Sequence, residues 1–339
     1  MGDKLFTVDL YGGSTDTMRK IFFTVILFGI LLLQGCTKDK PEVLFNISQL
    51  HNGDAKLLSD RYVVTSVDGK LTFISPEGKI INQDKNVNVN WCDVCEEDRF
   101  IVYGNWQKQI GICRYDENYN VVGNEIVMEI QEDLGIDPAV CKADGRYYMT
   151  VTHISGAINN GDINTENGTY TVKLYVSDDL KNWTEVSEVV SAGNNLEDID
   201  LNYYDGRLFV TYEKETVDKK ESSINLLISD DMGESFSENI VLIEANADNE
   251  PAAFVHMNDR YCLYYSSDIE NPGGTYEKSK VYVAEFDEKF NQTVEPRELE
   301  LYNNEGDLLY DVFIDNSKIY CLFAKHYLSD CDLVLECTK

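Results

Sequence analysis

The chain has 339 residues and carries 60 acidic against 29 basic side chains, which gives a formal net charge of −31 at pH 7. A field of this sign repels phosphate backbones and anionic lipid heads, so it excludes nucleic acid as an expected partner and favours neutral sugars or cations. The length suffices for one large domain.

The N-terminal stretch is predicted to be a targeting segment and not part of the folded domain. A basic start at residues 18–20 precedes an apolar run at residues 21–33, which is short for a bilayer span. The run closes in Leu33-Gln34-Gly35-Cys36. This pattern resembles a bacterial lipoprotein signal with its lipobox.

The resemblance implies that residues 1–35 are an N-terminal extension and signal peptide and that Cys36 is lipidated. Residues 36–41 would then be a short tether, and residues 42–339 a single domain. An ordinary signal anchor is the alternative. Either reading places the domain at the cell surface or the periplasmic side of the membrane, held there by its anchor.

One short motif recurs six times along the rest of the chain. An acidic residue opens a strand, a tight turn follows, and an aromatic-rich strand such as YYMTVT or LFVTYE comes next, with a third strand after it. The six turns begin at Asp60, Asp98, Asp144, Asp205, Asp259 and Asn316.

This period predicts an all-β propeller of four-stranded blades. Six blades are favoured, and five remain if the compact first copy is not a full blade. The last copy ends without a fourth strand. Residues 42–47 have no partner at the other end of the chain, so they are expected to supply that strand and close the ring.

Propeller topology sorts the loops by face. The long polar connections at residues 154–169, 214–222 and 267–278 belong on the same face as the starts of the first strands, where the acidic residues sit. Long loops gathered on one rim of a rigid scaffold commonly carry function. The site is therefore expected on this rim.

Two turns on the opposite face carry a signature. Residues 229–236, SDDMGESF, resemble the Asp box of sialidase-like propellers, and residues 177–183, SDDLKNW, resemble a related turn. Asp231 and Asp179 are expected to hold their turns together and not to act in catalysis. Sialidase activity is disfavoured because that family binds its substrate's carboxylate with three arginines. The arginines at positions 61, 99, 146, 207 and 260 all belong to the opposite face.

A second resemblance bears on chemistry. Asp137-Pro138-Ala139, Glu197-Asp198-Ile199-Asp200 and Glu250-Pro251-Ala252 look like the Asp, Asp, Glu series of glycoside hydrolase family 43. The resemblance implies Asp137 as general base, Asp198 as the carboxylate that tunes and orients, and Glu250 as general acid. Asp137 and Asp198 each lie eight residues before their turn glycine, at matching points of neighbouring first strands.

Two alternatives stay open within that assignment. Members of the family usually place one blade between the base and the second Asp, which would make Asp93 the base, and Asp200 can take the place of Asp198. The rim acids can also simply cap strands on an acidic surface. A non-catalytic propeller that binds a glycan or a protein partner is the competing hypothesis.

Other side chains are candidates for substrate contact. Trp91 and Trp106 flank the strand of Asp93 and can stack on sugar rings, or they can be buried packing residues. His153 and His256 lie on strands of different blades, where structural roles are the commoner case.

No cofactor is required by these patterns, although the acidic rim leaves calcium open, and a monomer is expected. The eight cysteines after Cys36 favour buried thiols over disulfides.

Overall fold

The computed structural model describes residues 41–50, 52–159, 162–163, 168–193, 195–217, 220–257, 259–273, 277–302, 306–327 and 331–338. Residues 41–339 form one compact unit. The expected signal segment and Cys36 lie outside the described residues, as do parts of the three long loops. Among the residues described, no helix has the length and apolar character needed to span a bilayer.

Six four-stranded antiparallel sheets make up this unit. Blade 1 contains β2 (Asn52–Leu57), β3 (Val63–Val67), β4 (Lys70–Ile74) and β5 (Ile80–Asn88). Blade 2 contains β6 (Trp91–Cys95), β7 (Phe100–Asn105), β8 (Gln109–Tyr115) and β9 (Val121–Glu129). Blade 3 contains β10 (Leu134–Ala143), β11 (Arg146–Ser155), β14 (Thr169–Ser177) and β15 (Thr184–Ala192).

The second half of the ring repeats the plan. Blade 4 contains β16 (Leu196–Tyr204), β17 (Arg207–Glu215), β18 (Ser222–Ser229) and β19 (Ile240–Ile243). Blade 5 contains β20 (Asn249–Met257), β21 (Arg260–Ser267), β22 (Lys280–Phe286) and β23 (Arg297–Glu298). Blade 6 contains β24 (Asp307–Asp315), β25 (Lys318–Lys325), β26 (Asp332–Thr338) and β1 (Glu42–Ile47).

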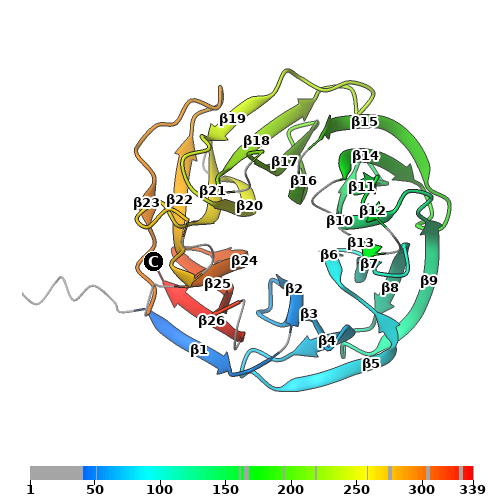
Figure 1. The fold of residues 1–339 in the computed structure, drawn as a ribbon. Coiled ribbons are helices and arrows are strands. Elements are labelled where there is room, and N and C mark those ends of the chain that lie inside the picture. Colours follow the sequence, from blue (N-terminus) through cyan, green and yellow to red (C-terminus); the bar gives the residue numbers. More distant parts are fainter. Residues whose placement is uncertain are drawn as a thin grey trace, which may run out of the picture. The chain divides into compact units, whose positions relative to one another are not determined.

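The sheets stand around a common axis with the first strand of each blade innermost (Figure 1). The compact first copy is a full blade, which confirms the propeller with six blades and removes the five-bladed alternative. β1 pairs antiparallel with β26, with Glu42 opposite Cys337 and Ile47 opposite Leu333. The strand from the start of the domain therefore closes the ring as predicted.

The hydrophobic core is divided among the blade boundaries. Six apolar clusters fill the spaces between neighbouring sheets, one for each boundary around the ring. Large side chains such as Phe73, Tyr103, Phe209 and Phe254 are almost fully buried there. Each buried side chain of this size contributes about 1.5–3 kcal/mol. Apolar packing between neighbouring blades thus stabilises the ring, and polar groups can occupy the axis.

The two signature turns have the expected structural role. Both oxygens of Asp231 bond Ser235, and Oδ1 of Asp179 accepts the backbone N–H groups of Lys181 and Asn182 at 2.9 and 2.8 Å. Trp183 packs into the apolar cluster between blades 2 and 3. All eight cysteines of the domain are free thiols, and Cys141 is the only one of them that is not buried.

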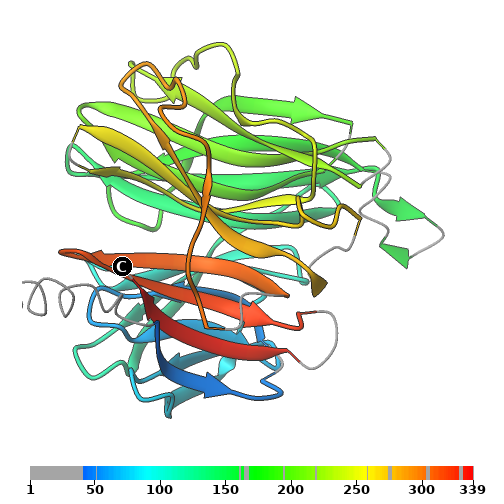
Figure 2. The same cartoon turned by 90° about the vertical axis from the view of Figure 1, so that its left-hand side faces the viewer.

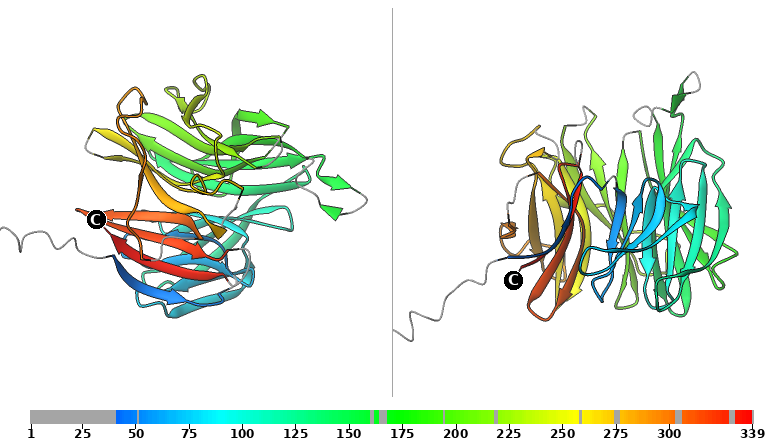
Figure 3. Two further views of the ribbon diagram at one scale, coloured as in Figure 1. Left: turned by 60° about the vertical axis from the view of Figure 1, so that its left-hand side comes forward. Right: turned by 90° about the horizontal axis from the view of Figure 1, so that it is seen from below.

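The long connections lie on one face of the ring. The loop after β11 carries a two-stranded hairpin, β12 (Ile158–Asn159) and β13 (Asp162–Ile163). Figures 2 and 3 show this hairpin projecting beyond the blades at the face where the first strands begin. That face carries the pocket described next.

Candidate active site

A pocket opens at the axis of the ring, with a volume of about 320 Å³. All six blades contribute to it through the starts of their first strands. Six of the residues that line this pocket are acidic, and Lys56 is the one cationic residue in the lining. The acids are Asp54, Asp137, Glu197, Asp198, Asp200 and Glu250.

Asp137 and Asp198 sit at irregularities in their strands. The pairing of β10 with β11 shifts between Ile136 and Ala139, and the pairing of β16 with β17 shifts between Glu197 and Asp200. The φ angles of Asp137 and Asp198 are 47° and 51°, and of the described residues outside glycine they are the only ones inside strands with positive φ. Left-handed backbone of this kind is costly, and it concentrates at functional sites.

These two bulges are connected across the blade boundary. Oδ2 of Asp137 accepts the backbone N–H of Asp198 at 3.1 Å. Burial, together with the charges of Asp198 and Glu197, raises the pKa of Asp137 well above its usual value. The carboxyl of Asp137 is thereby held in one orientation at the pocket wall.

Glu250 lies close to two other carboxyl groups, those of Asp198 and Glu213. Carboxylate oxygens of Asp198, Glu213 and Glu250 all lie within 4.8 Å of one another. Glu250 is 7% exposed, and burial followed by the charges of Glu213 and Asp198 raises its pKa well above its usual value. A carboxyl in such surroundings retains its proton to a higher pH than a free one. The three carboxyl groups therefore repel one another unless one of them holds a proton.

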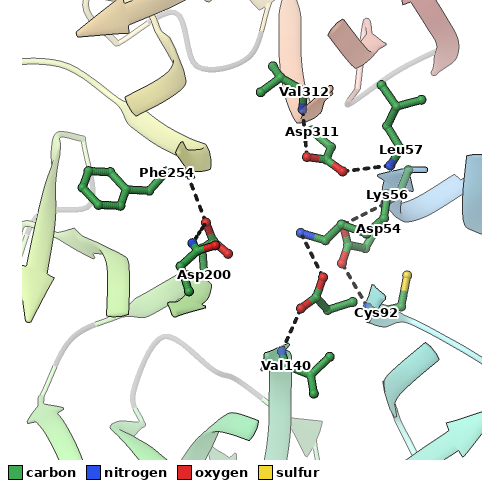
Figure 4. A network of polar contacts seen from close by, with 12 residues as sticks. Asp54, Lys56, Leu57, Cys92, Val140, Asp200, Phe254, Asp311 and Val312 are labelled. Carbon is green, nitrogen blue, oxygen red and sulfur yellow. Dashed lines mark hydrogen bonds and ion pairs between the residues drawn. The ribbon is translucent and has the colours of Figure 1, made fainter. Parts of the chain in front are cut away.

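Three acids from alternate blades face the axis around Lys56 (Figure 4). Asp93, Asp200 and Asp311 come from blades 2, 4 and 6, and each accepts a backbone N–H from the next blade, at Val140, Phe254 and Leu57 respectively. Figure 4 shows Lys56 extending into the space that these acids face. Its Nζ lies 3.9 Å from Oδ1 of Asp93.

The charge of these acids is balanced by Lys56. Burial acts to lower the pKa of Lys56, but the charges of Asp93, Asp54, Asp311 and Asp200 raise it well above its usual value. Burial in turn raises the pKa of Asp311 to about 7 despite the nearby ammonium. Lys56 is therefore a fixed cation at the floor of the pocket.

The structure brings together most of the acids predicted for the site. Asp137, Asp198, Asp200 and Glu250 line the pocket, whereas Asp93 is not among the lining residues. Trp91 and Trp106 also line it, with ring centroids 4.9 Å apart, and Trp106 is 49% exposed. The two tryptophans thus form an aromatic wall on the blade 2 side.

The two histidines lie elsewhere. His153 is buried, with Nδ1 2.9 Å from Oε2 of Glu132 and Nε2 2.8 Å from the Tyr175 hydroxyl. His256 stacks on Tyr261 near the turn face. Neither is among the pocket-lining residues.

Sequence reasoning missed four groups of this site: Asp54, Lys56, Glu213 and Asp311. A signal for Asp54 existed, because it opens the first strand of blade 1 as Asp137 opens that of blade 3. Burial raises the pKa of Asp54 to about 6. Lys56 and Glu213 carry no local pattern that separates them from surface residues.

Comparison with known proteins identifies the family of the chain. The profile of the family described as glycosyl hydrolases family 43 matches residues 130–314, which contain Asp137, Asp198 and Glu250. The chain belongs to this family. No curated protein sequence matches this family 43 chain.

Solved structures are similar at low identity. A thermostable family-43 glycoside hydrolase is 18% identical, with a TM-score of 0.42 over 56% of this chain and 63% of its own length. A beta-1,2-mannobiose phosphorylase from Listeria innocua is 9% identical, with a TM-score of 0.49 over 90% and 92%. An alpha-L-arabinofuranosidase from Fusarium graminearum is 11% identical, with a TM-score of 0.45 over 89% and 98%. The family 43 chain thus spans less than two thirds of the first of these.

Proposed function

We propose that this family 43 protein hydrolyses glycosidic bonds of a neutral carbohydrate in its axial pocket. The observation that carries the proposal is the meeting of Asp137, Asp198 and Glu250 from three successive blades at one pocket wall. A pair of carboxyl groups in different environments is the chemical requirement for glycoside hydrolysis.

The roles follow from burial. Glu250 is the most enclosed of the three, and burial together with the charges of Glu213 and Asp198 raises its pKa, so we assign it the role of the general acid that protonates the leaving oxygen. Asp137 accepts a proton from the attacking water, whose oxygen forms the new bond to the anomeric carbon as the glycosidic bond breaks. Asp198 orients both groups, through its backbone N–H on one side and its carboxylate on the other.

An inverting outcome suits this arrangement. Asp198 contacts Asp137 through its backbone N–H and Glu250 through its carboxyl group, and an inverting mechanism needs a separation of about 6.5–9.5 Å between base and acid to admit water. NMR of the sugar anomer released at early times tests the stereochemistry. Net retention would contradict the role of Asp137 as base.

The charge of the pocket supports a neutral substrate. Six acids and one lysine line it, and that lysine already faces carboxylates. A sialic acid, a uronic acid or a phosphate would meet repulsion there. Water is accordingly the proposed acceptor, and an anionic nucleophile such as phosphate is not.

A glycan screen with the wild-type domain and Glu250→Gln tests the proposal. Turnover of a neutral oligosaccharide that falls by about a hundredfold or more in the variant is the expected result. Turnover unaffected by the substitution would remove Glu250 from the mechanism. Binding without turnover would favour the non-catalytic glycan-binding propeller.

We also propose that the domain acts outside the cytoplasm, held to the membrane by lipid on Cys36. The support is the basic, apolar and small-residue-plus-cysteine order at residues 18–36. Metabolic labelling with a fatty-acid analogue is expected to mark the wild type and not Cys36→Ser. Equal labelling of both would contradict the anchor.

A further inference from the structure

Glu213 is a buried carboxyl close to Glu250 that the reaction above leaves unused. It lies on β17, the second strand of blade 4, and is 3% exposed. Its neighbours in the sheet are Glu197 on β16 and Ile224 on β18. A carboxyl at such a position is costly unless it is neutral or paired.

The groups that face this carboxyl are acidic. Oxygens of Asp198 and Glu250 lie within 4.8 Å of its own, and Glu197 and Glu215 act on it from β16 and from its own strand. Oε1 of Glu213 is buried without a hydrogen-bond partner among the described residues. A proton bound to Glu213 accounts for both the acidic surroundings and the unpartnered oxygen, because it removes the charge of the carboxylate and turns the group into a hydrogen-bond donor.

Glu250 has a matching environment. Besides Glu213 and Asp198, it is influenced by Asp248 from the segment before β20, and it acts in turn on Tyr327 beyond β25. Like charges this close in a water-poor site cannot both ionise at ordinary pH. Of the two glutamates, Glu250 is the one that lines the pocket, where a leaving oxygen can take the proton.

We propose that Glu213 is a positioning residue that shares one proton with Glu250 and thereby keeps Glu250 in the acid form. The catalytic use of that proton rests on the proposed hydrolysis. The presence of the proton on Glu213 and Glu250 does not depend on it. During turnover Glu250 passes the proton to the leaving oxygen. The proton that Asp137 takes from water returns to solvent, and solvent reprotonates the pair.

Glu213→Gln tests the effect on catalysis. The substitution keeps the shape, removes the like charge and adds an amide donor that stabilises ionised Glu250. The alkaline limb of the kcat/KM profile is expected to move down by about one pH unit or more. Glu213→Asp keeps the charge and is expected to hold the limb close to its wild-type position.

Glu336→Gln is the matched control. Glu336 is 2% exposed on β26, and its Oε2 accepts the Tyr302 backbone N–H at 2.7 Å. Its loss is expected to affect stability and to leave the alkaline limb unmoved. A limb that stays in place in Glu213→Gln, or moves equally in the control, would overturn the proposal.

Infrared spectroscopy of protein labelled with ¹³C at its glutamate carboxyls reads the proton without substrate. A protonated glutamate component is expected in the wild type at pH 7, lost in both Glu213→Gln and Glu250→Gln and kept in Glu336→Gln. Its absence from the wild type overturns the shared proton whether or not the variants fold. Its presence in a protein that cleaves no glycan would instead reject the hydrolase function alone.

Discussion

The backbone N–H of Asp198 donates a hydrogen bond to Oδ2 of Asp137 across the boundary between blades 3 and 4, over 3.1 Å. The bulge of blade 4 thus orients the carboxyl of the preceding blade. Both residues adopt left-handed backbone inside strands. A ring of six blades can hold such strain because the apolar clusters at each boundary fix the strands on either side.

Asp137→Asn is expected to lower kcat by about a hundredfold or more, because the amide cannot accept a proton from water. The substitution retains an oxygen for the Asp198 N–H, so the fold should persist. Asp93→Asn is the informative partner, since Asp93 lies outside the pocket lining and bonds the Val140 N–H.

Comparing kcat for the two variants with urea denaturation of each decides between the two bases. We expect the larger kinetic loss in Asp137→Asn. If Asp93→Asn lost as much turnover at unchanged stability, Asp93 would be the base.

The blades were predictable because their signals are local. Each turn, such as Asp144-Gly145-Arg146, is specified by adjacent residues, and the strand after it is marked by its apolar and aromatic content. Closure by residues 42–47 followed from counting strands. Repetition converts weak local patterns into a strong prediction of the ring.

The site could be predicted only in part, because a bulge decides which residue faces the pocket. Asp137 and Asp198 lie seven residues before the first residue of their turns, whereas Asp93, Asp200 and Asp311 lie five residues before theirs. The difference separates the two acids at the strand irregularities from the three acids around Lys56, but it acquires meaning only once those irregularities are known. Burial of Glu213 depends on a neighbouring blade and has no local signal.

Trp106→Ala is expected to raise KM by about tenfold with little change in kcat, because an exposed aromatic face binds substrate and transition state alike. The side chain lies beside Trp91 at the pocket and is 49% exposed. Tyr302→Ala removes an aromatic side chain that is 59% exposed and outside the pocket lining, so it serves as control. A fall in kcat at constant KM would argue against a binding role for Trp106.

Thermal stability is expected to decrease as pH rises from about 4.5 to 7. Burial raises the pKa of Asp54 to about 6 and that of Asp311 to about 7, from 3.8. The native state therefore binds more protons than the unfolded chain in this window, and its stability is lost as these groups ionise. His153, whose pKa burial lowers, acts in the opposite direction but is one group against several carboxyls.

Differential scanning calorimetry at low salt across this range provides the measurement. A melting temperature that rises steadily toward pH 7 would show that the axial carboxyls are ionised without cost. In that case the raised pKa values of Asp54 and Asp311 would be wrong.

Lys56→Met is expected to destabilise the propeller strongly at pH 8 and much less at pH 5. The ammonium faces Asp93, Asp54, Asp311 and Asp200, and its pKa is raised, so it is charged at both pH values. Removing one partner of buried charges costs about 3–5 kcal/mol when the others stay ionised. At pH 5 the acids of raised pKa bind protons instead, which relieves the repulsion.

Urea denaturation of the variant at the two pH values measures this difference. Lys181→Met is the control, because its ion pair with Glu125 at 3.2 Å is exposed on both sides and contributes little. Equal destabilisation of Lys56→Met at pH 5 and pH 8 would mean that packing of the lysine stem, and not its charge, holds the floor of the pocket. A loss confined to pH 8 would identify Lys56 as the cation that permits a ring of carboxylates to meet at the axis.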